Sequence, residues 1–279
     1  MHWETIIYER IDNIAKISLN RPETHNAQNV QLIKELDEAM KGAEKDTNIR
    51  VIILAGKGPS FSSGHDLKGL AERSQEGVKL YPTLEEQMRF EQEFFVDKCL
   101  AIRNLPKPTI AQVHGHCIAA GYMLASMCDI IMASEDAQFS NPVLRMTPSA
   151  AELLVEPWEM GARKAKEFLF TGDPIDAPEA WRLGMINRVV PQERLEEEVL
   201  KLAKKIALMP PVAISLTKAS VNRTLDLMGQ SNAFAYHFLI HQVSHRTDES
   251  RQFFDEKGRS EEKGLKTFLE KRDGLFKEP

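Results

Sequence analysis

The sequence of 279 residues predicts an α/β core followed by an α-helical C-terminal part. Up to Pro191, short apolar runs rich in β-branched residues alternate with segments of helical periodicity. This alternation is typical of βαβ-type units rather than of a meander of strands. After Pro191 the pattern is almost wholly helical. We therefore predict a core over residues 1–195 and a helical region over residues 196–279.

The N-terminal elements are predicted from alternation, helical periodicity and turn residues. The expected elements are, in order, strands at Ile6–Tyr8 and Ala15–Leu19 with a turn at Asp12–Asn13, a loop at Asn20–Asn26, a helix over 30–40 and a strand at Val51–Ala55. The helix is expected because apolar residues recur along one face from Val30 to Met40. The β-branched run at Val51–Ala55 ends at Gly56–Pro59, which favours a short buried strand.

The elements further along the chain follow the same signals. Residues 69–104 are strongly charged and expected to be mostly helical. After them we expect strands at Thr109–Val113 and Ile130–Ala133, a buried helix at Gly121–Cys128, and helices at Ala162–Phe170 and Ala177–Leu183. The stretch Phe139–Glu159 contains three prolines and is expected to be irregular.

The composition excludes several kinds of partner. A net charge of −5 gives no electrostatic reason to expect nucleic acid or an acidic membrane surface. No apolar run approaches the ~20 residues that a membrane-spanning helix needs. The alternating N-terminus is typical of a strand rather than of a signal peptide, and the three cysteines lack metal-ligand spacing. We therefore expect a cytoplasmic protein with reduced core thiols.

Two segments join a predicted strand to a predicted helix through small residues. The first, Phe61–Leu70 (FSSGHDLKGL), follows Val51–Ala55, and the second, His114–Asp129 (HGHCIAAGYMLASMCD), follows Thr109–Val113. Such junctions aim free backbone N–H groups at whatever lies in front of the helix. Two of them facing each other would hold an oxygen atom that becomes negative during acyl chemistry.

Together with three other pieces, these segments resemble the crotonase (enoyl-CoA hydratase/isomerase) superfamily, in its order and spacing over nearly the whole chain. The matching pieces are Leu19–Ala27 (LNRPETHNA), Val51–Leu70, His114–Asp129, Phe168–Pro191 and Phe268–Arg272 (FLEKR). The resemblance implies a crotonase-like spiral of ββα turns, a C-terminal α-helical trimerisation region and an acyl-CoA thioester as ligand. It also implies a homotrimer, or a hexamer built as a dimer of trimers. Coenzyme A would enter as part of the substrate, with no cofactor bound permanently.

By position, the resemblance places the two oxyanion donors on the N–H groups of His65 and Ala120. Gly64 and the trio Ala119–Gly121 would let the backbone approach the thioester closely, because bulky Cβ substituents would block it. Taken alone, the trio is equally well explained by tight helix packing. Paired with the upstream segment, it favours an oxyanion site.

For coenzyme A, the resemblance implies contacts from backbone atoms of two stretches and positive charge near the phosphates. The residues concerned are Thr24, His25, Ala27, Asp66, Leu67, Lys68, Gly121 and Lys271. Lys271, next to Arg272, would supply charge near the adenosine phosphates, and Lys68 would reach a phosphate directly. A solvated lysine at the start of a helix explains Lys68 equally well.

The two glutamates that hydratases of this family use are missing. Their positions are taken by Met123, two residues after the last glycine of the second segment, and by Val143, after the proline of FSNPV. Neither side chain transfers a proton, whereas hydration needs a base to activate water and an acid to protonate the α-carbon. The stretch Thr147–Met160 that follows is also altered and shorter. Neither the two-glutamate hydratase mechanism nor the single-glutamate isomerase mechanism is therefore supported.

Three functions remain open. The first is a lyase or hydrolase with a relocated acid/base, for which the imidazole of His65 is the leading candidate because it titrates near neutrality. The family's methylmalonyl-CoA decarboxylases also carry a GHD sequence here, although the tyrosine that they place downstream corresponds to Ser149. Glu152 and Glu156 are alternative acids, or else surface carboxylates on a short helix. The second function is a non-catalytic acyl-CoA binding protein, and the third is a hydratase that uses an unrecognised acid.

Three histidines, His237, His241 and His245, recur at i, i+4 and i+8 on a predicted helix and share one face. That spacing suits a pair of metal ligands, but the glutamate of an HExxH motif is absent and the interspersed residues are apolar. A polar stripe that lines an interface or a pocket is favoured, and no metal is predicted.

Overall fold

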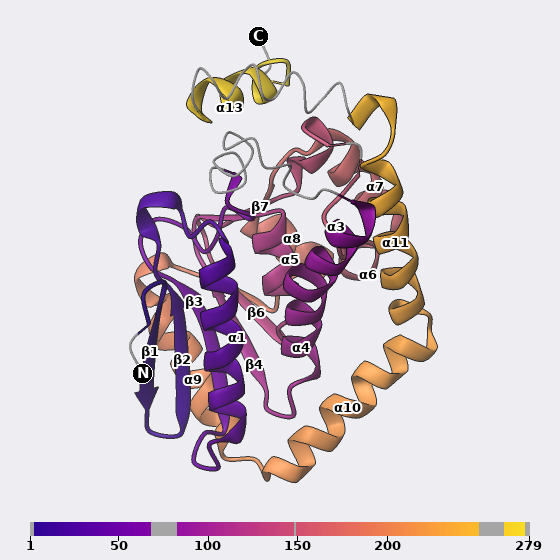
Figure 1. Cartoon of the computed structure of the whole chain (residues 1–279). Helices are drawn as coiled ribbons and strands as arrows, with labels where there is room; N and C mark the ends of the chain where they lie inside the picture. The colour runs from indigo at the N-terminus through magenta and orange to yellow at the C-terminus, as the bar shows by residue number, and fades with distance from the viewer. Residues whose placement is uncertain (1–2, 68–82, 148, 251–264, 277–279) are drawn as a thin grey trace.

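The computed structural model describes residues 3–67, 83–147, 149–250 and 265–276 (Figure 1). Within them, a large sheet has the strand order β1-β2-β3-β4-β6-β9, and a small sheet has the order β5-β7-β8. In the large sheet β1 and β2 are antiparallel and the other neighbours are parallel. The large sheet consists of β1 (Ile6–Ile11), β2 (Ile14–Leu19), β3 (Val51–Gly56), β4 (Thr109–Val113), β6 (Ile130–Ser134) and β9 (Arg188–Val190). The small sheet consists of β5 (His116–Ile118), β7 (Gln138–Ser140) and β8 (Ile175–Asp176).

Helices surround the two sheets. The α-helices are α1 (Val30–Lys45), α3 (Leu84–Glu91), α4 (Lys98–Asn104), α5 (Ala120–Ser126), α6 (Glu156–Met160), α7 (Ala162–Thr171), α8 (Ala177–Leu183), α9 (Leu195–Ala207), α10 (Pro211–Leu227), α11 (Gln230–Ser244) and α13 (Leu265–Gly274). Short helical turns lie at η1 (Pro22–Thr24), η3 (Pro142–Arg145) and η4 (Gln192–Arg194), and the π-helical turn η2 (Gln92–Asp97) links α3 to α4.

One face of the large sheet is covered by α9. Leu195, Val199, Ala203 and Ala207 follow one another at four-residue spacing and form the apolar face of that helix. They pack on alternate strand residues such as Ile53. α9 begins at the boundary predicted near residue 195, and its apolar face packs on the sheet of the core.

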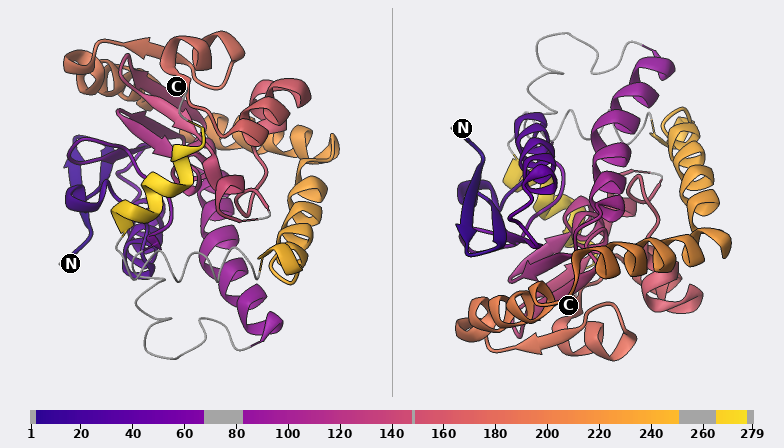
Figure 2. Two further views of the ribbon diagram at one scale, coloured as in Figure 1. Left: turned by 90° about the horizontal axis from the view of Figure 1, so that it is seen from above. Right: turned by 90° about the horizontal axis from the view of Figure 1, so that it is seen from below.

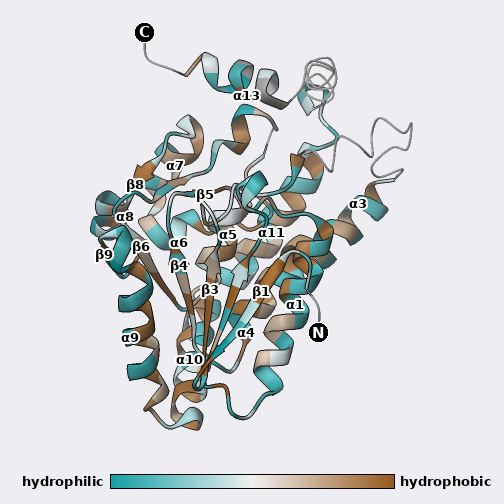
Figure 3. Cartoon of the chain, turned by 90° about the vertical axis from the view of Figure 1, so that its left-hand side faces the viewer, coloured by the Kyte–Doolittle hydropathy of each residue, from teal (hydrophilic) through white to brown (hydrophobic). Residues whose placement is uncertain are grey.

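The opposite face of the large sheet meets α1, α4 and α5. Alternation decides the two faces: in β2, Ala15, Ile17 and Leu19 point to this side, while Ile14 faces α9. Figure 3 shows the apolar strands lying between α9 on one side and α1 on the other. Both faces of the central strands β2, β3 and β4 are therefore buried, which is usual for parallel strands.

Within the described residues, the predicted strands and helices are found with small shifts of their ends, and one expectation was partly wrong. Of the stretch 69–104 that was expected to be mostly helical, residues 69–82 lie outside the described residues. The stretch Phe139–Glu159 is not uniformly irregular, since it includes the end of β7, η3 and the start of α6. The short strands β5, β7, β8 and β9 were not predicted. They are two or three residues long, so their periodicity is too brief to detect.

Of the C-terminal helices, α10 lies outside the core, whereas α11 packs on the core through Phe234 and Phe238. Figure 1 shows α10 running along the lower edge of the molecule and α11 rising along one side. α10 has no buried residue. Seen from above, α13 lies across the molecule (Figure 2), and Asp273 on it pairs with Arg145 at 3.4 Å. Among the described residues, no helix combines the length and the apolar character needed to cross a membrane.

Candidate active site

The loop that follows β2 is fixed by the side chain of Asn26. Its Nδ2 donates to the carbonyl oxygens of Lys57 (2.9 Å) and Ser60 (2.8 Å). His25 and Asn26 have φ of 53° and 55°, in the left-handed region where short polar side chains are tolerated best. The loop is thereby held against the chain that leads into the first of the two segments singled out in the sequence.

These two segments lie side by side. The N–H of Phe61 donates to the carbonyl of His114 at 2.8 Å, and the N–H of Ser62 donates to the carbonyl of His116 at 3.0 Å. The N–H of Ile118 donates back to the carbonyl of Ser62 at 2.9 Å. This parallel pairing brings both segments to the same place, directly before the start of α5.

Glycines allow the two segments to approach each other closely. A Cβ atom on Gly64 would lie 2.9 Å from the carbonyl oxygen of Ile118 and 3.4 Å from the nitrogen of Ala120. A Cβ atom on Gly121 would lie 2.5 Å from the carbonyl oxygen of Ser62. Gly64 also has a φ of 93°, which an alanine would rarely adopt. Both positions therefore require glycine.

Two backbone donors flank this contact. In the part of the chain that the structure describes, the N–H groups of His65 and Ala120 have no protein acceptor. Ala120 opens α5, whose first turn has no earlier helical carbonyl to bond. The residue before it, Ala119, has φ 49° and ψ −114°, an unfavourable conformation of the kind found at functional sites. Among the described residues, both N–H groups are therefore without a protein acceptor, and the nitrogen of Ala120 lies close to Gly64.

Asp66, expected beside coenzyme A, is engaged within the protein. Its N–H donates to the carbonyl of Gln28 at 3.1 Å, and its carboxylate pairs with Arg21 at 2.7 Å. Asp66 therefore ties the loop after β2 to the first segment, and its N–H is not available to a ligand.

The other residues expected to hold coenzyme A remain predictions. Lys68 lies outside the described residues, and so does the side chain of Lys271 on α13. Thr24 and His25 direct their carbonyl oxygens to Ser63, at 3.2 Å and 2.9 Å. The remaining expected residues in the described part are Ala27, Leu67 and Gly121.

A cavity of about 110 Å³ lies beside His65 and between α1, α4 and α5. Met123 lines it and is only 1 % exposed. Its other apolar lining residues include Leu32, Leu36, Met40, Phe95, Ile102 and Leu124. Val143 is buried as well. Both positions at which hydratases of the family carry glutamates thus hold buried apolar side chains. The wall of the cavity suits an apolar group.

The imidazole of His65 is held by the carboxylate of Glu152. His65 Nε2 lies 3.2 Å from Glu152 Oε2, and the ring packs on Phe95 with centroids 3.9 Å apart. His65 Nδ1 is buried and has no hydrogen-bond partner among the described residues. Burial alone would raise the pKa of the Glu152 carboxyl, but the charge and hydrogen bond of His65 lower it to about 2. An ionised Glu152 therefore fixes one ring nitrogen, while the other has no hydrogen-bond partner among the described residues.

Glu152 and Glu156 are not surface carboxylates, so that interpretation of the sequence was wrong. Glu152 lies before α6 in irregular chain, and Glu156 is the first residue of α6; both are buried. Asn141 donates to Glu156 at 2.6 Å, and burial raises the pKa of this carboxyl. The sequence gives no periodic signal for their burial, because tertiary packing of the irregular stretch produces it.

The histidine stripe on α11 faces the chain around Glu152. His237 Nε2 bonds the carbonyl of Ala151, and His241 Nδ1 bonds the carbonyl of Ala150, both at 2.8 Å. His241 Nε2 lies 3.9 Å from the second oxygen of Glu152. The stripe therefore supports the carboxylate that holds His65, a link between distant segments that periodicity on one helix cannot reveal.

Comparison with known proteins agrees with this architecture. A family model for enoyl-CoA hydratase/isomerase matches residues 9–279. A putative enoyl-CoA hydratase of Mycobacterium tuberculosis is 43% identical over 259 residues, which cover 87% of this chain and 81% of that protein. Enoyl-CoA hydratase domain-containing protein 3 of Rattus norvegicus, a mitochondrial protein, is 37% identical over 77% of this chain and 69% of its own length.

Solved structures extend the agreement to the fold. The crystal structure of an enoyl-CoA hydratase/isomerase from Xanthobacter autotrophicus Py2 superposes with a TM-score of 0.90 at 32% identity, covering 99% of this chain and 100% of that one. A probable enoyl-CoA hydratase from Mycobacterium smegmatis gives a TM-score of 0.80 at 45% identity, covering 86% and 94%. The predicted crotonase-like α/β fold with a helical C-terminal region is confirmed, and the chain belongs to the enoyl-CoA hydratase/isomerase family.

Proposed function

We propose that this protein acts on an acyl-CoA thioester by stabilising an enolate oxygen, with the imidazole of His65 as its proton-transfer group. One observation carries the proposal. His65 bears a predicted oxyanion donor on its backbone and, on its side chain, a ring that Glu152 holds at 3.2 Å. The second predicted donor, the N–H of Ala120, lies across Gly64. Preorganised donors and a positioned imidazole are the two parts that enolate chemistry needs.

Decarboxylation of a 2-carboxyacyl-CoA is the reaction that these parts suit best. The bond between the α-carbon and the carboxylate breaks, carbon dioxide leaves, and its electron pair forms the thioester enolate. The N–H groups of His65 and Ala120 stabilise the enolate oxygen. A proton on His65 Nδ1 is then transferred to the α-carbon, and the ring recovers a proton from water. A single proton-transfer group suffices, which matches the apolar side chains of Met123 and Val143.

Hydration of an enoyl-CoA is a second candidate, because the relatives named above are called hydratases. In that reaction the same imidazole would take a proton from water and return it to the α-carbon. A non-catalytic acyl-CoA binding protein is less well supported, since it has no need of a buried carboxylate to hold the His65 ring. In each case coenzyme A enters and leaves with the substrate, and the His65 site keeps no organic cofactor between turnovers.

The test is turnover of methylmalonyl-CoA, crotonyl-CoA and a 3-hydroxyacyl-CoA by the full chain, followed by chromatography. We expect loss of carbon dioxide from methylmalonyl-CoA and, in deuterated water, one deuterium at the α-carbon of the product. His65→Gln keeps the backbone N–H and should lower kcat by about 10²-fold or more, as loss of a general acid does. Glu152→Gln should lower kcat less, and Glu38→Gln, an exposed carboxylate elsewhere, should leave it unchanged.

The other outcomes separate the alternatives. Turnover of crotonyl-CoA with the same dependence on His65 would replace the decarboxylase by a hydratase with a relocated acid/base. Binding of all three thioesters without turnover would contradict an enzymatic role and leave the binding protein. Turnover that His65→Gln does not change would overturn the assignment of the proton-transfer group.

A further inference from the structure

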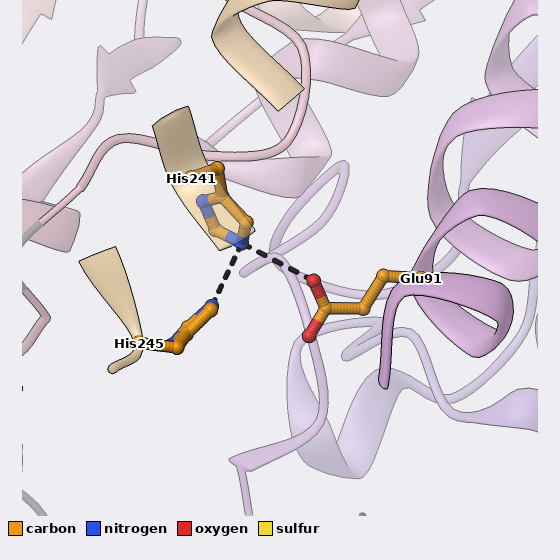
Figure 4. Close-up of side chains that lie close together, drawn as sticks. All are labelled: Glu91, His241 and His245. Atoms are coloured by element: carbon orange, nitrogen blue, oxygen red, sulfur yellow. Dashed lines mark hydrogen bonds and ion pairs between the residues drawn. The ribbon is translucent and has the colours of Figure 1, made fainter. Parts of the chain in front are cut away.

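Behind the His65 site, three electron-pair donors converge on one point. Glu91 at the end of α3, His241 on α11 and His245 directly after α11 turn their side chains toward one another (Figure 4). His241 Nε2 lies 3.3 Å from Glu91 Oε2 and 3.0 Å from His245 Nε2. All three ligand atoms lie within 4.8 Å of one another. Glu91 and His241 are buried, and His245 is half-buried.

Hydrogen bonds alone satisfy the acceptor atoms of these three side chains poorly. His241 Nδ1 lies 2.8 Å from the carbonyl oxygen of Ala150, and a carbonyl only accepts, so Nδ1 carries a hydrogen. In the neutral form of the ring, Nε2 would present its lone pair to Glu91 and His245. If Nε2 also carries a hydrogen, this single hydrogen faces His245 Nε2, Glu91 Oε2 and, at 3.9 Å, Glu152 Oε1. One divalent cation would interact favourably with all of them.

Hydrogen bonds from neighbouring groups hold the side chains of His241 and Glu91 in place, as such bonds do for metal ligands. The carbonyl of Ala150 fixes the tautomer of His241 that leaves Nε2 free to coordinate. Gln87 Nε2 donates to Glu91 Oε1 at 3.0 Å, and Gln242 Nε2 donates to Glu91 Oε2 at 2.5 Å. These amides hold the carboxylate in place from α3 and from α11. The second oxygen of Glu152 faces the same point, while its first oxygen holds His65.

We propose that Glu91, His241 and His245 form a binding site for one Zn²⁺ ion. Two imidazoles and one carboxylate are a donor set that zinc binds tetrahedrally, with a fourth position for water or a further carboxylate. Glu152 is placed to take that position or to bond its water. The ion would tie α3 to α11 and neutralise the two buried carboxylates. The proposal does not depend on the reaction that the His65 site catalyses.

The experiment uses the full chain, purified without chelator, loaded with Zn²⁺ and then desalted. Mass spectrometry of the metal content should find about one Zn²⁺ per chain, and removal of the ion with EDTA should lower the melting temperature. Loading the stripped protein with Co²⁺ should give the visible absorption of a tetrahedral cobalt site, a readout independent of any activity. Glu91→Gln and His245→Gln should each raise the Kd for Zn²⁺ by at least about tenfold.

His237→Gln is the matched control. It changes the third histidine of the same stripe, whose Nε2 already bonds the carbonyl of Ala151, and should retain Zn²⁺ as the wild type does. A wild-type protein that retains no more Zn²⁺ than Glu91→Gln, and gives no tetrahedral Co²⁺ spectrum, would overturn the site. So would an equal loss of Zn²⁺ in His237→Gln and His245→Gln. The Co²⁺ spectrum of the wild type decides the question even if a variant fails to fold.

Discussion

At the scale of single residues, Gly121 faces the carbonyl oxygen of Ser62 and limits how closely the two donor segments can approach. The contact has no room for a methyl group, since a Cβ atom there would lie 2.5 Å from that oxygen. Gly42, exposed on α1, has no atom within 4 Å of its Cβ position and provides a comparison within the same chain.

Gly121→Ala should lower the free energy of unfolding by about 1–3 kcal/mol, as overpacking does, and should weaken acyl-CoA binding by displacing Ala120. Gly42→Ala should instead stabilise the protein by roughly 0.5–1 kcal/mol, because alanine is the better helix former. Urea unfolding of both variants measures the difference. A Gly121→Ala protein as stable as the wild type would show that the segments have room to move apart.

The apolar side chains of Met123 and Val143 lead to a prediction about the rate of hydration. Crotonyl-CoA hydration by the wild type should fall several orders of magnitude below that of a two-glutamate enzyme, because each acid/base group contributes roughly 10²–10⁴-fold. Met123→Glu combined with Val143→Glu should raise the hydration rate if the two backbone donors lie as inferred. Initial rates measured from the loss of enoyl absorbance provide the check. Wild-type hydration at an ordinary rate would mean that His65 and Glu152 already supply the protons.

What the sequence could predict at this scale depends on how local the signal is. The small residues around Gly64 and Gly121 were recognisable because a fixed spacing reveals them. The contact between His65 and Glu152 was not, because it joins segments 87 residues apart through irregular chain that carries no periodicity. Glu91 was missed as a neighbour of the histidine stripe for the same reason.

At the scale of elements, α1 is attached to the residues directly before β1 by one buried carboxylate. Glu35 accepts hydrogen bonds from the N–H of Thr5 (2.7 Å), the hydroxyl of Thr5 (2.6 Å) and the N–H of Glu4 (3.0 Å). Burial raises the pKa of the Glu35 carboxyl, but these hydrogen bonds outweigh it and lower the pKa to about 2. The ionised form is therefore the one that stabilises the contact between helix and strand.

Glu35→Gln should lower the free energy of unfolding at pH 7 by up to about 3 kcal/mol. This is the stabilisation that follows when folding lowers the pKa of Glu35 from 4.5 to about 2. Because the folded pKa is the lower one, this contribution is complete above pH 4.5 and is lost as pH falls toward 2. The gap between variant and wild type should therefore close over that window in urea titrations. Glu38→Gln, an exposed carboxylate on the same helix, should change stability by less than about 0.5 kcal/mol.

Among the strands, the number of residues decided which ones could be predicted from the sequence. Strands of five or six residues such as β3 and β4 combine a β-branched run with turn residues at their ends, and their positions were predicted to within a residue. The small sheet escaped prediction because β5, β7 and β8 have at most three residues each. They form where the donor segments pair, so the fold around the site was the least predictable part.

At the scale of the whole molecule, the C-terminal helices expose an apolar surface that one chain leaves uncovered. The large apolar side chains concerned are Leu208, Met209, Val212, Leu216, Val221, Leu227, Met228, Tyr236, Leu239, Ile240 and Val243, each at least 44 % exposed. α10 is attached to the core by polar contacts, including Arg103 to Asp226 at 2.9 Å and Lys218 to Asp129 at 2.8 Å. We propose that copies of this chain bury this surface in a homotrimer or hexamer.

Light scattering should give a mass that is three or six times 31.6 kDa for the wild type. Val212→Glu combined with Leu216→Glu places two charges on one face of α10 and should lower the mass toward that of a single chain, because buried unpaired charges are costly. Phe170→Glu, an exposed apolar residue outside these helices, serves as the control and should leave the mass unchanged. A wild-type protein that stays monomeric at micromolar concentration would contradict the proposed assembly.

The pairing of Ser62 with residues 116–118 also determines how fast a backbone amide exchanges its hydrogen with solvent. The amide of Ile118 is hydrogen-bonded only while the carbonyl of Ser62, far away along the chain, stays in register with it. Its exchange with deuterated solvent therefore requires the two donor segments to separate, and the exchange rate measures how often they do. Slow exchange at Ile118 beside fast exchange in α10 would mean that the donor pair stays assembled in the empty protein, ready before any thioester arrives.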